Sequence, residues 1–275
     1  MDRSLRVSLV DFLNARPLTW GLLKQPPPGF SVSRDLPSVC AEKLASGEAD
    51  VGLIPSIEFK RIPGLVRVEG LGIAADSEVR SVLLVSKVSR DRIRTVSLDP
   101  ASRTSAVLTR LLLKRVYGLN PEFLEAGAES RVPSPESRVP GLEPDARLVI
   151  GDPALKTRLA GLVVLDLAAE WKSWTGFPFV FAFWAVRREA WRAEFPGIFD
   201  RALRFAMENF DAMVEEELST IAAGSLLSRP MVEDYLRHCL HYRLTEADEK
   251  GLELFYNLAA EESALASESP AAAGA

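Results

Sequence analysis

The stretch "LPSVCAEKLASGEADVGLIPS" (residues 36–56) contains a complete helix-to-strand unit and decides the fold class. Pro37 suits the first position of a helix, and Val39 and Leu44 supply apolar positions for its buried side. Gly47 suits the C-terminal cap, because glycine readily adopts the left-handed backbone found there. The apolar run "ADVGLIP" that follows is typical of a buried strand. The stretch therefore predicts an α-helix that leads directly into a strand.

The same alternation occurs at least twice more along the chain. Residues 95–120 begin with an apolar strand pattern, continue as a helical pattern and stop at Gly118. Residues 146–159, "ARLVIGDPALKTRL", place a strand before Asp152 and Pro153, which suit the cap and first turn of a helix. Repeated alternation of this kind is typical of largely parallel sheets covered by helices. We therefore predict an α/β protein.

Two long apolar stretches suggest how the chain is divided. "VRSVLLVSKV" (79–88) and "FPFVFAFWAV" (177–186) both have the pattern of buried strands, and they bracket the middle of the chain. We expect them to cross between two lobes, with residues 1–85 and 186–275 forming the first lobe and residues 86–185 inserted as the second. From about Glu189 onward, apolar residues recur at three- and four-residue spacing, which predicts helices that close the first lobe.

Two segments carry no predicted chemistry. Residues 127–144 contain "ESRVP" twice at a seven-residue offset, and their prolines exclude a helical heptad, so we interpret them as a connector. The low-complexity end "SALASESPAAAGA" (263–275) is expected to be a disordered tail.

Composition excludes several classes of protein. The 275 residues are 47% hydrophobic, and 33 Lys plus Arg stand against 38 Asp plus Glu without a dense basic stripe, so nucleic acid is not an expected partner. No apolar run approaches the roughly 18 residues of a membrane span, and the N-terminal region lacks the pattern of a secretory signal. Cys40 and Cys239 cannot build a disulfide framework. We expect a cytoplasmic protein; oligomeric state is not predicted.

The usual signatures of metal, nucleophile and nucleotide chemistry are missing from the sequence. His238 and His241 fall in one segment that we interpret as a helix, but no acidic or Cys partner completes a zinc set. The sequence contains no G-x-S-x-G and no glycine-rich phosphate loop. We predict no metal and no cofactor.

Asn14 lies where the first strand pattern gives way to the first helix, in "VDFLNARPLTWGLL" (10–23). As a turn residue, Asn tolerates left-handed backbone, and Pro17 suits a helix start. Alternatively, Asn14 faces a ligand, because strand ends in open α/β sheets border the crevice where ligands bind.

Small polar residues occupy other strand ends. Ser102, Thr104 and Ser105 stand at a predicted helix start, where unpaired N–H groups favour an anion, although these hydroxyls would also suit plain capping. Ser56 follows another strand, and Gly151 with Asp152 follows a third. If these ends open toward one crevice, they form a pocket for a small oxygen-rich anion. In "EWKSWTGFPFVFAFWA" (170–185), Phe181 and Phe183 are interpreted as core, whereas Trp174 and Thr175 either pack there or line the cleft.

Taken together, these blocks resemble a known family. "VDFLNARPL", "GEADVGLIPSIEF", "SVLLVSKV", "LDPASRTSAVL", "LVIGDPAL" and "EWKSWTGFPFVFAFWA" stand in the order seen in the MqnA-type chorismate dehydratases of the futalosine route to menaquinone. The resemblance implies a two-lobed fold like that of type 2 periplasmic binding proteins, with the ligand between the lobes. It also implies dehydration of chorismate to 3-[(1-carboxyvinyl)oxy]benzoate without a cofactor. The related dihydroxynaphthoate synthases look different around Asn14, which favours the dehydratase.

The resemblance suggests roles for the polar residues. Asn14 and Ser86 are expected to be catalytic, and the helix start at 102–105 to hold the ring carboxylate. Further substrate-binding residues are expected to be Arg16, Ser56, Gly151, Asp152, Trp174 and Thr175. The proton acceptor is either a substrate carboxylate or Asp152. A protein that only binds a small carboxylate anion is the alternative function.

Overall fold

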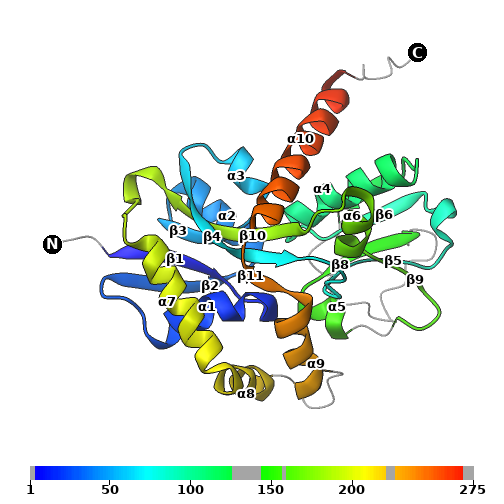
Figure 1. The fold of residues 1–275 in the computed structure, drawn as a ribbon. Coiled ribbons are helices and arrows are strands. Elements are labelled where there is room, and N and C mark those ends of the chain that lie inside the picture. Colours follow the sequence, from blue (N-terminus) through cyan, green and yellow to red (C-terminus); the bar gives the residue numbers. More distant parts are fainter. Residues whose placement is uncertain (1–3, 126–143, 157–158, 221–226, 269–275) are drawn as a thin grey trace.

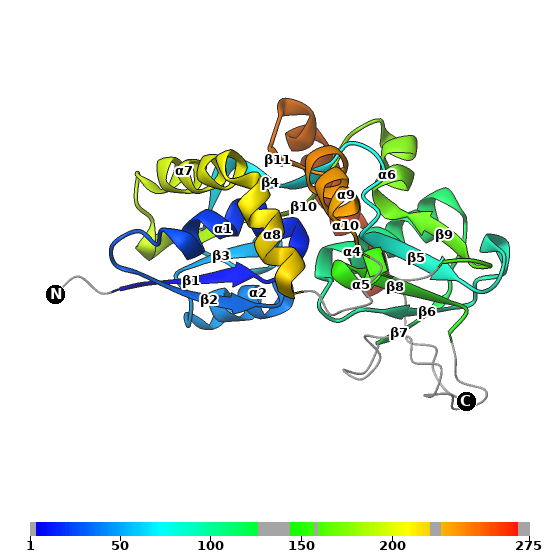
Figure 2. The same cartoon turned by 90° about the horizontal axis from the view of Figure 1, so that it is seen from below.

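The computed structural model describes residues 4–125, 144–156, 159–220 and 227–268. These residues form two β-sheets, one of six strands and one of five, which lie side by side with helices around them (Figures 1 and 2). We call the six-stranded sheet with its helices the first lobe and the five-stranded sheet with its helices the second lobe. This arrangement confirms the predicted α/β class. The predicted connector at 127–144 lies almost wholly outside the described residues.

The sheet of the first lobe has the strand order β11-β4-β10-β3-β1-β2. Its strands are β1 (Leu5–Val10), β2 (Phe30–Asp35), β3 (Val51–Pro55), β4 (Leu65–Ala75), β10 (Phe179–Arg187) and β11 (His241–Arg243). β1 pairs in parallel with β2 and β3, as the predicted alternation requires. β10 runs antiparallel between β3 and β4, because it enters the sheet from the second lobe.

The sheet of the second lobe has the order β7-β6-β8-β5-β9. Its strands are β5 (Val82–Ser86), β6 (Thr95–Leu98), β7 (Glu122–Glu125), β8 (Ala146–Ile150) and β9 (Val163–Asp166). β6 pairs in parallel with β7 and β8, whereas β5 is antiparallel to β8 and β9. In each sheet, therefore, the strand that crosses from the other lobe runs antiparallel to both of its neighbours. In the first sheet, the edge strand β11 is also antiparallel to its neighbour β4.

Ten α-helices lie within the described residues. They are α1 (Arg16–Lys24), α2 (Pro37–Ser46), α3 (Glu58–Arg61), α4 (Arg103–Leu111), α5 (Asp152–Lys156), α6 (Leu167–Thr175), α7 (Phe195–Glu208), α8 (Phe210–Thr220), α9 (Arg229–Asp234) and α10 (Glu246–Glu268). Short 3₁₀-helices cover Leu13–Ala15, Arg90–Arg92 and Arg188–Ala190, and π-helical turns cover Leu112–Val116 and Tyr235–Cys239.

The helix-to-strand unit at residues 36–56 is formed as predicted. Pro37 stands in the first turn of α2, and Gly47 ends the helix with φ +77°, a conformation that glycine adopts without the steric penalty of a side chain. β3 follows and is buried along its whole length.

The expected lobe boundaries are wrong by one strand each. Val82–Ser86, expected mostly in the first lobe, belongs to the second sheet, and Phe179–Arg187, expected mostly in the second lobe, belongs to the first sheet. The chain changes sheet at residues 76–81 and again at 167–178. Apolar runs reveal that a strand is buried, but the sheet that buries it depends on tertiary pairing.

The C-terminal region also differs from the predicted helices in three respects. His241–Arg243 is a strand paired with β4, so His238 and His241 do not share one helix. α10 continues to Glu268, so the expected disordered tail does not begin at 263, and residues 269–275 lie outside the described residues. α10 also touches both lobes, because Tyr256 donates a hydrogen bond to the Ser56 carbonyl and Glu262 pairs with Lys114.

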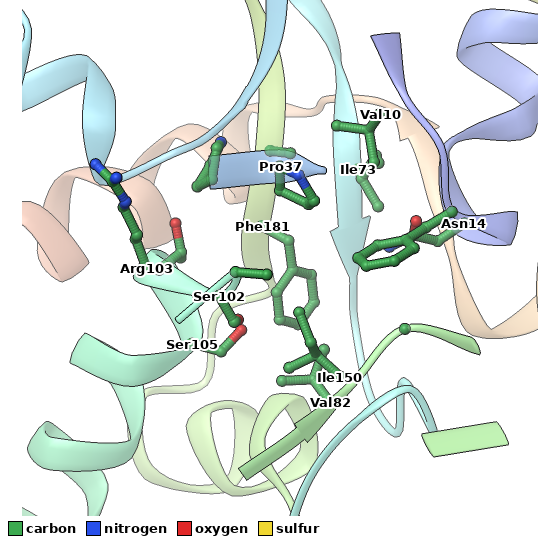
Figure 3. Close-up of a pocket in the computed structure, with 16 residues that line it drawn as sticks. Val10, Asn14, Pro37, Ile73, Val82, Ser102, Arg103, Ser105, Ile150 and Phe181 are labelled. Carbon is green, nitrogen blue, oxygen red and sulfur yellow. The ribbon is translucent and has the colours of Figure 1, made fainter. Parts of the chain in front are cut away.

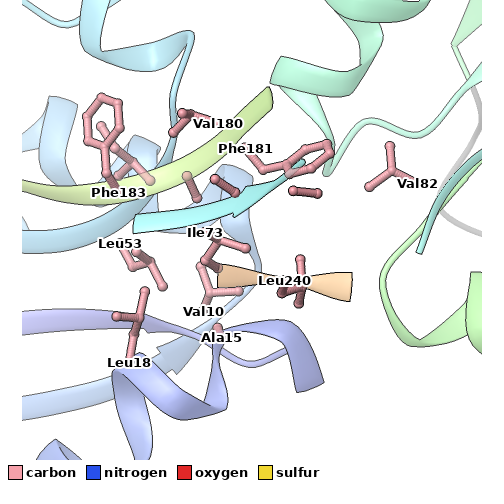
Figure 4. Packing of buried hydrophobic residues seen from close by; sticks show 14 of the residues in the cluster. Val10, Ala15, Leu18, Leu53, Ile73, Val82, Val180, Phe181, Phe183 and Leu240 are labelled. Atoms are coloured by element: carbon pink, nitrogen blue, oxygen red, sulfur yellow. The ribbon is translucent and has the colours of Figure 1, made fainter. Parts of the chain in front are cut away.

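The core runs without interruption from the first lobe toward the second (Figure 4). Val10, Ile73, Phe181 and Val82 are buried members of this core, and they lie where the two sheets meet. Within the described residues, no helix combines the length and apolar character needed to cross a membrane.

Candidate active site

A narrow pocket lies between the lobes, with a cavity volume of about 60 Å³. The first lobe contributes eight of its lining residues, and the second lobe contributes the other eight (Figure 3). The lining residues are Val10, Phe12, Asn14, Pro37, Pro55, Ile73, Phe181 and Ala182 from the first lobe, and Val82, Ala101, Ser102, Arg103, Thr104, Ser105, Ile150 and Gly151 from the second. Asn14 and Thr104, far apart in the sequence, thus share one hollow.

Most of the pocket wall is apolar. Phe181, Ile73, Val82 and Ile150 form its middle, between the polar groups on either side (Figure 3). Such a wall excludes water and packs against the faces of a flat ring, while a few polar groups set the orientation of a ligand. Sequence reasoning assigned Phe181 to the core and did not assign the other three to the site, because a buried strand residue beside a cavity has the same pattern as one inside a core.

The first turn of α4 supplies the polar groups on one side. Ser102 occupies the N-cap position, but its side chain makes no capping hydrogen bond to the helix. The hydroxyls of Ser102 and Ser105 line the pocket instead, beside the first backbone N–H groups of a nine-residue helix. Helix starts have N–H groups without intrahelical acceptors and a partial positive charge, which together favour an anion. Plain capping by Ser102 is therefore not what the structure shows.

Asn14 stands on the opposite side of the pocket (Figure 3). It is the middle residue of the 3₁₀ turn Leu13–Ala15, which joins β1 to α1. Its Oδ1 atom is buried and has no hydrogen-bond partner among the described residues. A buried amide oxygen without a partner costs free energy, so this atom is available to a donor on a bound ligand.

Thr104 and Ser56 meet across the lobes. The Thr104 hydroxyl accepts the backbone N–H of Ile57 at 3.2 Å and lies 3.4 Å from the Ser56 hydroxyl. Ser56 donates to the Val180 carbonyl at 2.8 Å and is fully buried. Ser56 does not line the pocket; it supports Thr104, which does.

Arg103 is a lining residue that the sequence analysis did not select. Its guanidinium donates to Glu58 at 3.0 Å and to Glu42 at 2.5 Å, both in the first lobe. Since the positive charge is matched by these carboxylates, the polar groups open to a ligand are largely uncharged ones. The signal that could have found Arg103 is its place inside "SRTS" at the helix start.

Gly151 and Asp152 contact the first lobe directly. Gly151 lines the pocket with φ +64°, and a side chain there would meet the Phe12 ring at 3.2 Å. Asp152 does not line the pocket; its Oδ1 accepts the backbone N–H of Leu13 at 3.0 Å. Burial raises the pKa of Asp152, although the Leu13 N–H acts in the opposite direction.

Besides Ser56 and Asp152, four further expected site residues lie outside the pocket. Ser86 is at the far end of β5 from Val82, and its hydroxyl donates to the carbonyls of Val88 and Asp145. The Arg16 guanidinium is buried against Asp11 and Glu217. Thr175 donates to the Trp171 carbonyl inside α6, and Trp174 packs edge-on against Trp171. The structure therefore does not bring these four residues to the pocket, because proximity in sequence to a site motif does not determine which way a side chain points.

The described residues contain no group of three or more His, Cys, Asp or Glu side chains able to hold a metal ion. His241 pairs with the Asp248 carboxylate at 2.8 Å. Cys40 and Cys239 are free and buried, and burial raises the pKa of Cys40 to about 12. Both thiols therefore pack as small apolar side chains.

Two curated proteins are similar to this chain in sequence. A chorismate dehydratase of Thermus thermophilus is 31% identical over 249 residues, covering 82% of this chain and 86% of that protein. A chorismate dehydratase of Campylobacter jejuni is 30% identical over 188 residues, covering 66% of this chain and 67% of that protein.

Solved structures confirm the fold. A protein of Archaeoglobus fulgidus superimposes with a TM-score of 0.73 at 18% identity, covering 94% of this chain and 98% of that one. The periplasmic aliphatic sulphonate binding protein of Escherichia coli superimposes with a TM-score of 0.56 at 19% identity, covering 94% and 93%. The predicted periplasmic-binding-protein-like fold is thus confirmed.

The family described as "Menaquinone biosynthesis" matches residues 5–261, which is nearly the whole described chain. With its fold, its pocket between two lobes and its curated relatives, this chain belongs to the menaquinone-biosynthesis family that includes chorismate dehydratases.

Proposed function

We propose that this protein dehydrates chorismate to 3-[(1-carboxyvinyl)oxy]benzoate, the reaction of the futalosine route to menaquinone. The observation that carries the proposal is the pairing of uncharged hydrogen-bonding groups across one pocket, with Asn14 on one side and the α4 start on the other. The names of the curated relatives support the choice of substrate.

The substrate supplies the driving force of this reaction. Chorismate loses the hydrogen on C3 and the hydroxyl on C4, and the ring becomes aromatic as one water leaves. No electron is gained or lost overall, so the reaction requires no redox partner. The protein therefore has to hold a dianion in a reactive pose and stabilise charge as it develops.

The α4 start suits the ring carboxylate. When C3 loses its proton, negative charge spreads through the C1–C2 double bond into this carboxylate. The Ser102 and Ser105 hydroxyls and the first N–H groups of α4 would hold that charge, since preorganised donors in a water-poor site stabilise an anion strongly. The ring itself would pack against Phe181 and Ile73.

Asn14 then lies across the pocket from the carboxylate. Its Oδ1 would accept a hydrogen bond from the C4 hydroxyl and its amide N–H group would donate to an enolpyruvyl oxygen, which orients both around C3. Asn is a poor base at neutral pH, so the C3 proton is assigned to a carboxylate of the substrate. We keep the cytoplasm as the proposed compartment, in line with two free buried cysteines.

The test is direct incubation with chorismate. Conversion should give an aromatic product 18 mass units lighter that coelutes with authentic 3-[(1-carboxyvinyl)oxy]benzoate, and deuterium at C3 should slow single-turnover formation if removal of the C3 proton limits the rate. A boiled sample measures the spontaneous decay of chorismate. Saturable binding of chorismate without any product above that background would instead favour a solute-binding protein, the alternative that the likeness to the sulphonate binding protein raises.

A further inference from the structure

Asp152 of the second lobe makes a hydrogen bond to the first lobe through its carboxylate. It is the first residue of α5 in the second lobe, and its Oδ1 accepts the Leu13 N–H of the first lobe at 3.0 Å. The neighbouring Gly151 comes so close to the first lobe that a side chain on it would meet the Phe12 ring at 3.2 Å. Residues 151–152 and 12–13 therefore form a direct contact between the two lobes.

The group that Asp152 holds belongs to the turn that carries Asn14. Leu13 opens the 3₁₀ turn Leu13–Ala15, and the first N–H of a helical turn has no acceptor inside it. Phe12, at the N-cap position, provides no side-chain acceptor either. Asp152 fills this role from across the cleft, so the start of the turn is capped by the other lobe.

The far end of the turn is fixed within the first lobe. Arg16 follows the turn directly, and its guanidinium pairs with Glu217 of α8 at 2.5 Å and with Asp11 at 2.6 Å. The Arg16 side chain is only 7% exposed, and both of these partners lie in the first lobe, so this end is held by contacts within that lobe. Asn14 itself has an unpartnered Oδ1, which means that the backbone of the turn has to orient its amide.

We propose that Asp152 is a positioning residue for Asn14: when the lobes close, its carboxylate binds the Leu13 N–H and fixes the turn that aims the Asn14 amide into the pocket. This inference rests on the proposed function, in which Asn14 contacts the substrate. Asp152 takes no proton from the substrate, since it does not line the pocket and its Oδ1 is engaged by a backbone N–H.

The role needs an acceptor oxygen rather than a base. Burial raises the pKa of Asp152, but a neutral carboxyl group still has an oxygen that accepts the Leu13 N–H. An asparagine at this position also has an acceptor oxygen, whereas an alanine has none. Asp152→Asn and Asp152→Ala therefore separate positioning from proton transfer.

The experiment compares both variants with the wild-type protein in steady-state turnover of chorismate. Asp152→Asn should keep kcat within about threefold, and Asp152→Ala should lower kcat by about 10- to 100-fold with a smaller change in KM, because a catalytic group displaced by 1 Å loses up to about that much. Lys172→Ala is the matched control: it removes an exposed contact at 2.6 Å with Asp76, which joins the two segments where the chain changes sheet, and should leave kcat unchanged.

Three outcomes would overturn the inference. If Asp152→Asn loses as much turnover as Asp152→Ala, the carboxylate acts as a base or a charge. If neither variant changes kcat, the contact has no role in the reaction. If Lys172→Ala lowers kcat as much as Asp152→Ala does, the loss comes from weakened contacts around the lobe junction in general and not from the turn that carries Asn14.

A second measurement is independent of turnover. Amide hydrogen exchange in a peptide covering residues 11–17 should be faster in Asp152→Ala than in the wild type, and close to wild type in Asp152→Asn. Equal exchange in all three proteins overturns the inference. If wild-type protein does not convert chorismate, the proposed function fails, while this exchange still decides whether Asp152 holds the turn.

Discussion

Arg103, in the first turn of α4, donates a hydrogen bond of 3.0 Å to Glu58 of α3, and this pair joins the two lobes at the rim of the pocket. The Glu58 side chain is 3% exposed, whereas Glu42, the second partner of Arg103, is 60% exposed. The two carboxylates that pair with the Arg103 guanidinium thus differ strongly in their burial.

This difference predicts unequal effects on stability. Glu58→Gln should lower the free energy of unfolding by about 1.5–3 kcal/mol, which is the range for a hydrogen bond to a charged group. The substitution weakens the hydrogen bond from Arg103 and also the one from Arg61. Glu42→Gln should change the free energy of unfolding by less than about 1 kcal/mol, because exposed ion pairs contribute little. Urea unfolding at neutral pH measures the free energy of unfolding of both variants. Equal decreases would show that burial of the carboxylate does not set the strength of its pairing with Arg103.

A side chain added at Gly151 is expected to crowd the contact between the lobes. Gly151→Ala should lose about 1–2 kcal/mol from its positive φ and about 1–3 kcal/mol more from crowding against the Phe12 ring. Gly161→Ala is the matched control, because Gly161 has φ +80° and a Cβ atom added to it would meet nothing within 4 Å, so only the backbone cost applies. Thermal unfolding of both variants measures the difference, and equal destabilisation would contradict the crowding argument.

Substitutions at Asn14 and Ser86 are expected to affect turnover differently. Asn14→Ala should lower kcat for chorismate by about 100-fold, comparable to the loss of one preorganised hydrogen-bonding group at a reacting centre. Ser86→Ala should leave kcat unchanged, because its hydroxyl bonds to backbone carbonyls outside the pocket. Rate measurements over a range of chorismate concentrations compare them, and a large loss in Ser86→Ala would return Ser86 to the site.

The Asp248 carboxylate is expected to contribute to the stability of the fold in a pH-dependent way. Burial alone would raise its pKa, but hydrogen bonds from His241 and Thr245 outweigh burial and lower the pKa below the ordinary 3.8. A carboxyl group with a lowered folded pKa stabilises the fold above its unfolded pKa, and this contribution is lost as the pH falls through the folded value.

Asp248→Asn should therefore be less stable than wild type at pH 5, and the deficit should shrink at pH 3 and below. Urea midpoints of the two proteins at these pH values measure the change. A deficit that stays constant down to pH 2 would mean that Asp248 is not stabilised as a carboxylate.

Local pattern was sufficient for the individual units of the fold. The helix from Pro37, its glycine stop at Gly47 and the strand Val51–Pro55 were predicted because capping, left-handed glycine and apolar runs are properties of neighbouring residues. The start of α4 was predicted as a helix start that either binds an anion or is capped by its own hydroxyls, since helix polarity follows from the chain itself.

Tertiary structure decided which units meet. Pairing partners far away in sequence decide which sheet receives Val82–Ser86 and Phe179–Arg187. They also decide that His241–Arg243 is a strand. The family resemblance suggested catalytic roles for both Asn14 and Ser86. Of the two, Asn14 lines the pocket and Ser86 does not, because the direction of a side chain depends on packing around the whole element. The sequence by itself determined those elements whose start, stop and apolar pattern are local, and the chemical character of their ends. The approach of the two lobes determined which ends form a site, because contacts between distant segments depend on packing and not on neighbouring residues.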